Sequence, residues 1–248
     1  MTHGCCHLSL VPVRESASDK SQMVSQLLFG DVFEILEENA KWIKIKNAFD
    51  NYEGWIDAKQ CLNITSEYFL KKKPQILQSS MDLVDYVQDN NKHLLPVVLG
   101  SSVFGMKDLG YDFEINQNDG SVRKQDIVST ALLYLNSPYL WGGKSPFGID
   151  CSGLTQMVYK LCGIKLFRDA SQQALQGQGL SFIEEAEPGD LAFFDNDEGQ
   201  IIHVGIIMKN NYIIHAHGKV RIDRLDHTGI FNTEIKNYTH KLRVIKQL

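Results

Sequence analysis

The spacing of hydrophobic residues changes near residue 122, so a single regular pattern cannot describe the whole chain. Between Leu8 and Ile64, short β-prone runs such as "DVFEIL" and "WIKIK" alternate with polar or glycine-bearing turns such as "DNYEG". This alternation is typical of a small all-β unit. Beyond residue 122, "KQDIVSTALLYLN" and "CSGLTQMVYKLCG" have helical spacing, and β-type runs follow them. Helices followed by antiparallel strands predict an α+β domain over residues 122–248.

Composition narrows the classes of function. The 248 residues are 43% hydrophobic and 22% charged, which is typical of a soluble globular protein. A formal net charge of −5 argues against nucleic acid or an anionic membrane as the main partner. No apolar run has the length of a membrane span. The start of the chain lacks the basic and apolar regions of a secretory signal, so we expect a cytoplasmic protein.

The five cysteines are an odd number, which fits a reducing compartment better than a disulfide framework. Two of them stand in "HGCCH" at positions 3–7. Zinc sites normally use wider pairs such as C-x₂-C, so we interpret this stretch as the start of the first strand.

Cys151 is the candidate nucleophile. It stands in "GIDCSGL", directly before or at the start of a predicted helix. A helix N-terminus carries partial positive charge and unpaired N–H groups, which favour a thiolate and help to stabilise an oxyanion. The structural alternative is a small buried thiol that packs under the first helical turn.

Histidines of a predicted hairpin offer the base. "IIHVGIIM" and "YIIHAH" are joined by Lys209-Asn210-Asn211. If the pairing centres on Asn210, His203 faces His217, Gly205 faces His215, and all these side chains lie on one face. A cysteine, a histidine and an orienting group indicate a thiol hydrolase, with a zinc site as the rival interpretation. The residues alone do not decide between His215 and His217 as the orienting group.

A family resemblance joins these features. The blocks "SPYLWGGKSPFGIDCSGLTQMVYKLCGI", "FRDASQQ", "EPGDLAFFDN", "HVGIIM" and "YIIHAHGKVRID" resemble the NlpC-type cell-wall cysteine peptidases, a papain-like family. "VPVRES", "MVSQLLFGDVFEIL", "WIKIK" and "YEGWI" resemble a bacterial SH3-like domain. The resemblance implies a multidomain fold, with one or more N-terminal all-β SH3-like barrels followed by an α+β papain-like catalytic domain. We expect an SH3-like domain at 1–64, a second, degenerate SH3-like domain plus linker at 65–121, and the peptidase domain at 122–248.

The same resemblance implies roles for individual residues. Cys151 is the nucleophile, His203 the general base and later acid, His215 the residue that orients His203, and Tyr139 a support for the oxyanion. His217 departs from the family pattern. Asp150 and Ser152 match substrate contacts beside the nucleophile, although Asp150 is equally a candidate helix N-cap. The remaining implied substrate contacts are Asp169 in "FRDASQQ", Tyr52 and Glu15.

The implied activity is hydrolysis of the bond between γ-D-Glu and an L-diamino acid, diaminopimelate or Lys, in short murein peptides with a free N-terminal L-Ala. The chain resembles endopeptidases of murein-peptide recycling, for which short peptidoglycan-derived peptides are the partners and no cofactor or metal is required. Two alternatives remain open: a non-catalytic murein-peptide-binding protein, and an amidase or acyltransferase on the same thiol scaffold. The sequence leaves the oligomeric state open.

Overall fold

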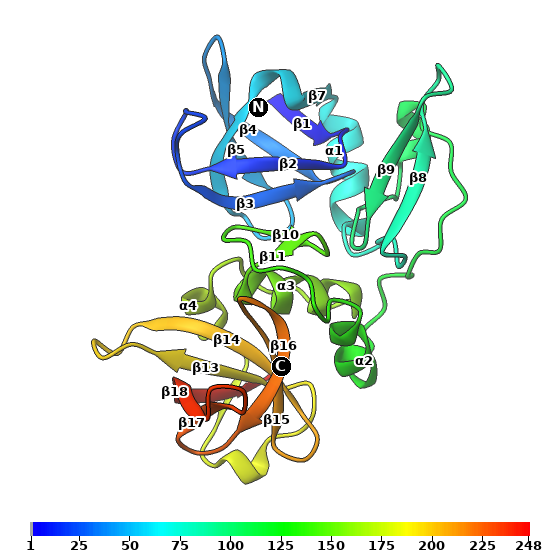
Figure 1. Ribbon diagram of the computed structural model, residues 1–248. Coiled ribbons are helices and arrows are strands. Elements are labelled where there is room, and N and C mark those ends of the chain that lie inside the picture. Colours follow the sequence, from blue (N-terminus) through cyan, green and yellow to red (C-terminus); the bar gives the residue numbers. More distant parts are fainter. Residues whose placement is uncertain (1) are drawn as a thin grey trace.

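The structure is a computed structural model that describes residues 2–248, so Met1, where the first predicted domain begins, lies outside the described part. An N-terminal part rich in strands and a C-terminal part with helices and a second sheet lie one above the other (Figure 1). Within residues 2–248, no helix is both long enough and apolar enough to cross a membrane.

The first part is an all-β unit built as the hydrophobic alternation predicts. Ile43 and Ile45 are buried, whereas Lys44 and Lys46 between and beside them are half-buried, so one face of the strand meets the core. The seven strands pair in the order β3-β2-β6-β5-β4-β1-β7. They are β1 (Thr2–Cys6), β2 (Leu10–Arg14), β3 (Met23–Leu28), β4 (Val32–Glu38), β5 (Trp42–Asn47), β6 (Glu53–Asp57) and β7 (Cys61–Ile64). The "HGCCH" stretch is therefore largely strand β1, and Cys5 and Cys6 are fully buried.

The middle segment differs from the second SH3-like domain that the sequence predicts over residues 65–121. It consists of α1 (Ser66–Lys72), one hairpin of β8 (Val84–Gln88) and β9 (Leu94–Val98), and short helical turns. The β-prone run "YDFEI" at residues 111–115 forms only an isolated bridge, from Asp112 to Gln88. A single hairpin cannot close a barrel, and Pro96 within β9 lacks the N–H that a further strand would need. The hairpin instead shares a core with the first barrel, including Phe29 and Val97.

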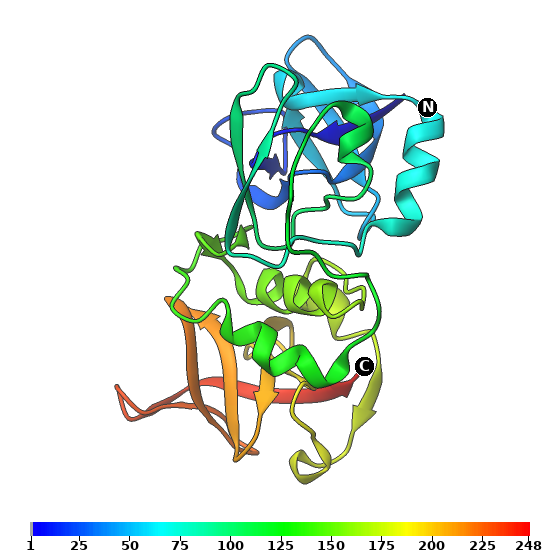
Figure 2. The same ribbon diagram turned by 90° about the vertical axis from the view of Figure 1, so that its right-hand side faces the viewer.

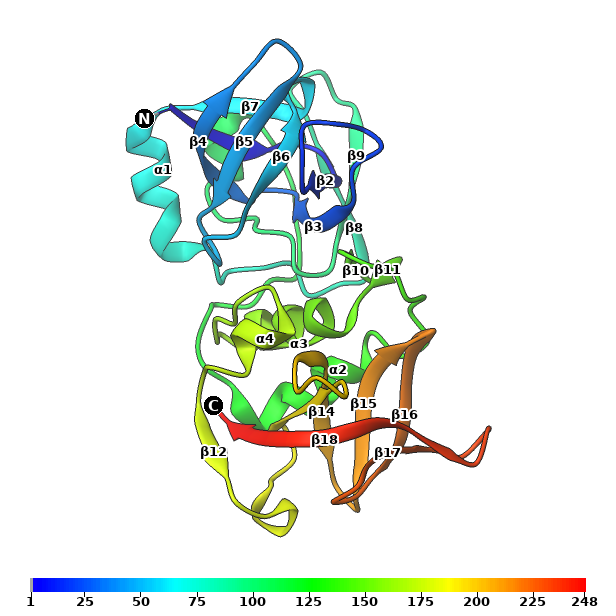
Figure 3. The ribbon, with the colours of Figure 1, turned by 90° about the vertical axis from the view of Figure 1, so that its left-hand side faces the viewer.

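The C-terminal part places helices before strands, as predicted. Its helices are α2 (Ile127–Leu132), α3 (Cys151–Leu161) and α4 (Ala170–Gln173), and β10 (Lys144–Ser145) with β11 (Gly148–Ile149) forms a small hairpin. The seven-stranded sheet has the order β12-β18-β13-β14-β15-β16-β17, and β17 also pairs with β18 (Figure 3). Its strands are β12 (Gln178–Leu180), β13 (Leu191–Asp195), β14 (Ile201–Met208), β15 (Tyr212–His217), β16 (Lys219–Leu225), β17 (Gly229–Asn232) and β18 (Asn237–Gln247).

Helix α3 lies between the two parts of the molecule (Figure 2) and is buried on every side. One face packs on the sheet, while polar side chains on the other reach the N-terminal part. The Lys160 ammonium donates to the Gly100 carbonyl and the Ser102 hydroxyl, each at 3.0 Å, and lies 3.4 Å from an Asp31 oxygen. The Gln156 amide donates to Asp50 at 2.9 Å. Both parts of the molecule therefore hold the helix that begins at Cys151.

Candidate active site

Cys151 is the first residue of α3, at the position that the sequence predicts. Asp150 is the N-cap, and its side chain accepts a hydrogen bond from the backbone N–H of Gly153 at 2.7 Å. The thiol is buried, and this burial, followed by the charge of Asp150, raises its pKa to about 12. Backbone N–H groups of Val204 and Ser152 oppose the shift but do not cancel it. The helix start alone therefore does not make Cys151 a thiolate at neutral pH, and a neighbouring base is needed.

The hairpin that carries the base has the predicted register. Gly205 pairs with His215 and Met208 with Tyr212, around a turn in which Asn210 and Asn211 both have positive φ. A side chain at Gly205 would collide with its neighbours, because a Cβ there would lie 2.9 Å from the His215 Cβ. The glycine thus leaves space for the His215 imidazole on the sheet.

His203 and His215 are both buried and directly linked. His203 Nε2 lies 2.9 Å from His215 Nδ1, whereas His217 is exposed. His215, and not His217, is therefore the residue that holds the His203 ring. Burial, followed by the neighbouring histidines, lowers the pKa of His203 well below its usual value, so its imidazole is neutral and able to accept a proton.

The sequence prediction missed the residue behind this pair. His215 Nε2 lies 3.0 Å from the Asp223 carboxylate, which also accepts two hydrogen bonds from Arg221, at 2.7 and 3.1 Å. Burial by itself would raise the pKa of Asp223, but the hydrogen bonds from His215 and Arg221 outweigh it and lower the pKa. The register of the β15–β16 hairpin could have predicted Asp223. His215 pairs with Arg221, and Asp223 is the next residue on the same face of β16.

A third histidine, His240 of β18, was also missed, and it raises the question of a metal. Ring nitrogens of His203, His215 and His240 lie within 4.8 Å of one another. The His203 and His240 rings are stacked, however, with centroids 4.0 Å apart and planes at 22°. Lone pairs lie in the ring planes, so these two do not converge on one point as zinc requires. Cys151 is outside the cluster, and the arrangement fits proton transfer better than the rival zinc site.

Tyr139 lies next to the nucleophile segment and forms a parallel bridge with Ile149. Burial, and then the charges of Cys151 and Asp150, raises its pKa to about 12. The phenol is thus protonated at neutral pH and available as a hydrogen-bond donor, as its expected oxyanion role requires.

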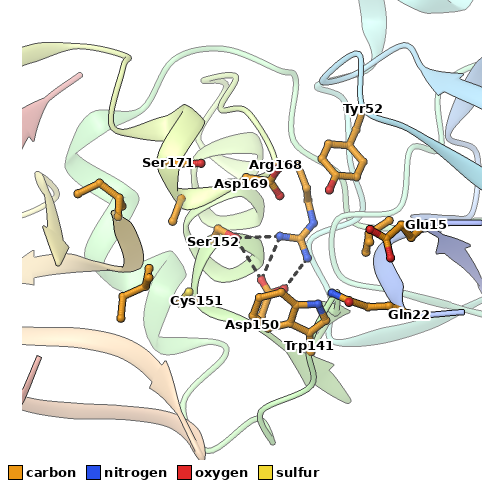
Figure 4. Close-up of a pocket in the computed structure, with 14 residues that line it drawn as sticks. Glu15, Gln22, Tyr52, Trp141, Asp150, Cys151, Ser152, Arg168, Asp169 and Ser171 are labelled. Atoms are coloured by element: carbon orange, nitrogen blue, oxygen red, sulfur yellow. Dashed lines mark hydrogen bonds and ion pairs between the residues drawn. The ribbon is translucent and has the colours of Figure 1, made fainter. Parts of the chain in front are cut away.

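The predicted substrate residues lie together around one cavity of about 540 Å³, with Cys151 in its wall (Figure 4). Glu15 and Tyr52 reach it from the N-terminal barrel, and Asp169 lies next to Tyr52. Buried His203 and His215 and half-exposed Tyr139 are not among the described lining residues. The lining consists of Glu15, Gln22, Val24, Tyr52, Trp141, Asp150, Cys151, Ser152, Arg168, Asp169, Ala170, Ser171, Ile201 and Ile202.

Arg168 is a further residue that the prediction missed. Its buried guanidinium binds Asp150 through two contacts of 2.6 and 3.0 Å and donates to the Ser152 hydroxyl at 2.9 Å. Asp150 also accepts the backbone N–H groups of Gly142, at 2.8 Å, and Gly153, at 2.7 Å. These four contacts fill the acceptor sites of the carboxylate. The structure therefore does not support the expected pairing of Asp150 with a substrate amine, and Glu15 and Asp169 are the other carboxylates in the cavity wall.

Comparison with known proteins agrees with this geometry. Residues 136–239 match the NlpC/P60 family, and residues 13–60 match the bacterial dipeptidyl-peptidase Sh3 domain. The C-terminal part of the chain is a cysteine-peptidase domain of the NlpC/P60 family. The predicted combination of an N-terminal SH3-like unit with this domain is thus confirmed.

Relatives with both parts are known. A γ-D-glutamyl-L-lysine dipeptidyl-peptidase of Bacillus cereus is 26% identical over 231 residues, which cover 80% of this chain and 68% of that protein. Dipeptidyl-peptidase 6 of Lysinibacillus sphaericus is 27% identical, over 83% of this chain and 85% of that protein. The crystal structure of an NlpC/P60 family protein from Bacillus cereus has the same fold, with a TM-score of 0.76 at 20% identity over 99% of both chains.

Proposed function

We propose that the chain is a dipeptidyl-peptidase that hydrolyses the bond between γ-D-Glu and an L-diamino acid in short murein peptides with a free N-terminal L-Ala. The observation that carries this proposal is the cavity beside Cys151, because the N-terminal barrel contributes Glu15 and Tyr52 to its wall. The names of the relatives from Bacillus cereus and Lysinibacillus sphaericus support the same activity.

The reaction is a thiol acyl transfer in two steps. Cys151 attacks the γ-carbonyl carbon of D-Glu while His203 takes the thiol proton, which is necessary because burial keeps the thiol protonated. His203 Nε2 is committed to His215, so Nδ1 is the nitrogen that accepts this proton. His203 then gives the proton to the departing amine of the diamino acid, and a thioester remains. Water, deprotonated by His203, hydrolyses the thioester and restores the thiol.

Selectivity for a free amino end follows from the charge of the cavity wall. An ammonium group that enters the cavity meets the carboxylates of Glu15 and Asp169, and the Tyr52 hydroxyl as a further acceptor. A longer peptide has no ammonium at this position and would have to pass the barrel. The enzyme thus acts on short peptides. We place this activity in the cytoplasm, as a step of cell-wall recycling.

The test is product analysis by mass spectrometry with L-Ala-γ-D-Glu-L-Lys, its diaminopimelate counterpart and their N-acetylated forms. We expect release of the free diamino acid from the unblocked peptides only. Cys151→Ala is expected to abolish cleavage, whereas Cys61→Ser, a cysteine change in the N-terminal barrel, retains it. Binding without cleavage would favour the peptide-binding alternative, and transfer to an added amine instead of water would favour the acyltransferase.

A further inference from the structure

A continuous line of hydrogen bonds runs from the catalytic base into the sheet and ends on a carboxylate. His203 Nε2 lies 2.9 Å from His215 Nδ1, and His215 Nε2 lies 3.0 Å from a carboxylate oxygen of Asp223. All three side chains are buried, with the Asp223 side chain only 1% exposed. The Arg221 guanidinium pairs with the same carboxylate through two nitrogen atoms and also reaches Glu234 at 3.1 Å. Arg221 thus holds both oxygens of the Asp223 carboxylate, one of which also faces His215.

The carboxylate decides where the protons of both imidazoles lie. An ionised Asp223 accepts only, so the hydrogen on His215 stands on Nε2 and points at Asp223. His215 Nδ1 then carries a lone pair and accepts, so the hydrogen on His203 stands on Nε2. His203 Nδ1 is left with a lone pair, which is the form that a base needs to take the thiol proton of Cys151.

We propose that Asp223 is a positioning residue for the peptidase reaction, which fixes the tautomer of His203 through His215. The identity of the reaction rests on the proposed function. The order of the hydrogen bonds from Asp223 to His203 does not, because it is independent of the substrate. The negative charge of Asp223 also stabilises the positive charge that His203 acquires when Cys151 is deprotonated. Arg221 holds the carboxylate in place through both of its oxygens.

Asparagine at position 223 can keep this order only with its NH₂ group against an N–H of Arg221. One oxygen of Asp223 accepts from both His215 and the Arg221 Nε, and the other accepts from the Arg221 Nη2. If the amide oxygen replaces the first, the amide NH₂ faces an Arg221 N–H. If it replaces the second, the NH₂ faces His215 Nε2, and both imidazoles change tautomer. His203 Nδ1 would then carry hydrogen and could no longer act as the base.

The first measurement needs no variant. Nitrogen-15 NMR of the imidazoles in the full-length protein is expected to show both His203 and His215 with hydrogen on Nε2. Hydrogen on Nδ1 of His203 in the wild-type protein would overturn the proposal. This readout is also independent of cleavage, so it separates a failure of the proposal from a failure of the proposed function.

The second measurement compares Asp223→Asn with Glu234→Gln, which removes the other carboxylate that Arg221 contacts. Asp223→Asn is expected to lower kcat about 10- to 100-fold at a nearly unchanged KM, the range typical of residues that orient a ligand or base from behind. It should also slow alkylation of Cys151 and shift the His203 nitrogen signals. Glu234→Gln should leave kcat, the alkylation rate of Cys151 and the His203 nitrogen signals unchanged. Wild-type kcat, alkylation rate and nitrogen signals in a folded Asp223→Asn protein would refute the positioning role.

Discussion

Replacing Arg168 by methionine tests what Asp150 does beside the nucleophile. The change removes the guanidinium that pairs with Asp150 at 2.6 and 3.0 Å, while a methionine fills part of the same volume. The two side chains are 1% and 7% exposed, so Asp150 would remain as a buried charge without a counter-ion. Breaking a buried pair in this way costs about 3–5 kcal/mol of the free energy of unfolding.

The second change, Asp150→Asn, separates the charge from the helix cap. An asparagine still accepts the hydrogen bond of the Gly153 N–H, so the N-cap of α3 is retained. In the double variant Arg168→Met/Asp150→Asn no unpaired charge is left, and we expect about 2 kcal/mol of the lost stability to return. Urea unfolding followed by circular dichroism measures the three variants. An Arg168→Met protein within about 1 kcal/mol of the wild type would refute the reasoning.

Activity of Asp150→Asn distinguishes the two roles considered for this residue. If Asp150 shapes the start of α3, the variant loses kcat and leaves the preference for unblocked over N-acetylated peptides unchanged. If Asp150 binds the substrate amine, the variant raises KM for the unblocked peptide alone. We expect the first result, because hydrogen bonds from within the protein already fill the carboxylate. The second result would restore the role that the sequence resemblance implies.

Two further predictions concern other buried or half-buried groups. Burial lowers the pKa of Lys72 to about 8 from an ordinary value of 10.5, so between these values the unfolded chain binds more protons than the folded one. Stability relative to Lys72→Met should therefore rise with pH across this window, and a pH-independent difference in urea unfolding at pH 7 and pH 10 would contradict it. Tyr139→Phe should lower kcat about 100- to 1,000-fold with little change in KM, as expected when one oxyanion donor is lost. Steady-state rates equal to those of the wild type would exclude Tyr139 from that role.

Local patterns were sufficient to predict the start of α3 and the register of the hairpin. Asp150 before Cys151 is an N-cap signal, and the alternation around Asn210 fixes which residues of β14 and β15 face each other. Both signals depend on neighbours a few residues apart. The family resemblance then selected His215 as the partner of His203, which the residues alone had left open.

Contacts between distant segments could not be predicted in the same way. His240 stacks on His203 because β18 pairs with β13 and β17. Local sequence patterns do not predict this long-range pairing. The fold buries Arg168 against Asp150, which lies 18 positions earlier in the chain, so local sequence does not indicate this pair. The β-prone run "YDFEI" forms no strand, because β-propensity describes a side chain that fits a sheet and not the presence of a partner strand.

The seating of α3 on the N-terminal part has a consequence for how such a protein can change over time. The bonds from Lys160 to Gly100, Ser102 and Asp31 make the N-terminal part a support for the nucleophile as well as a wall of the cavity. In this chain the peptidase domain is therefore tied to its N-terminal part by a buried contact. A new N-terminal partner would have to supply acceptors for the buried ammonium, so the two parts are expected to be inherited together and to accumulate compensating substitutions at this contact.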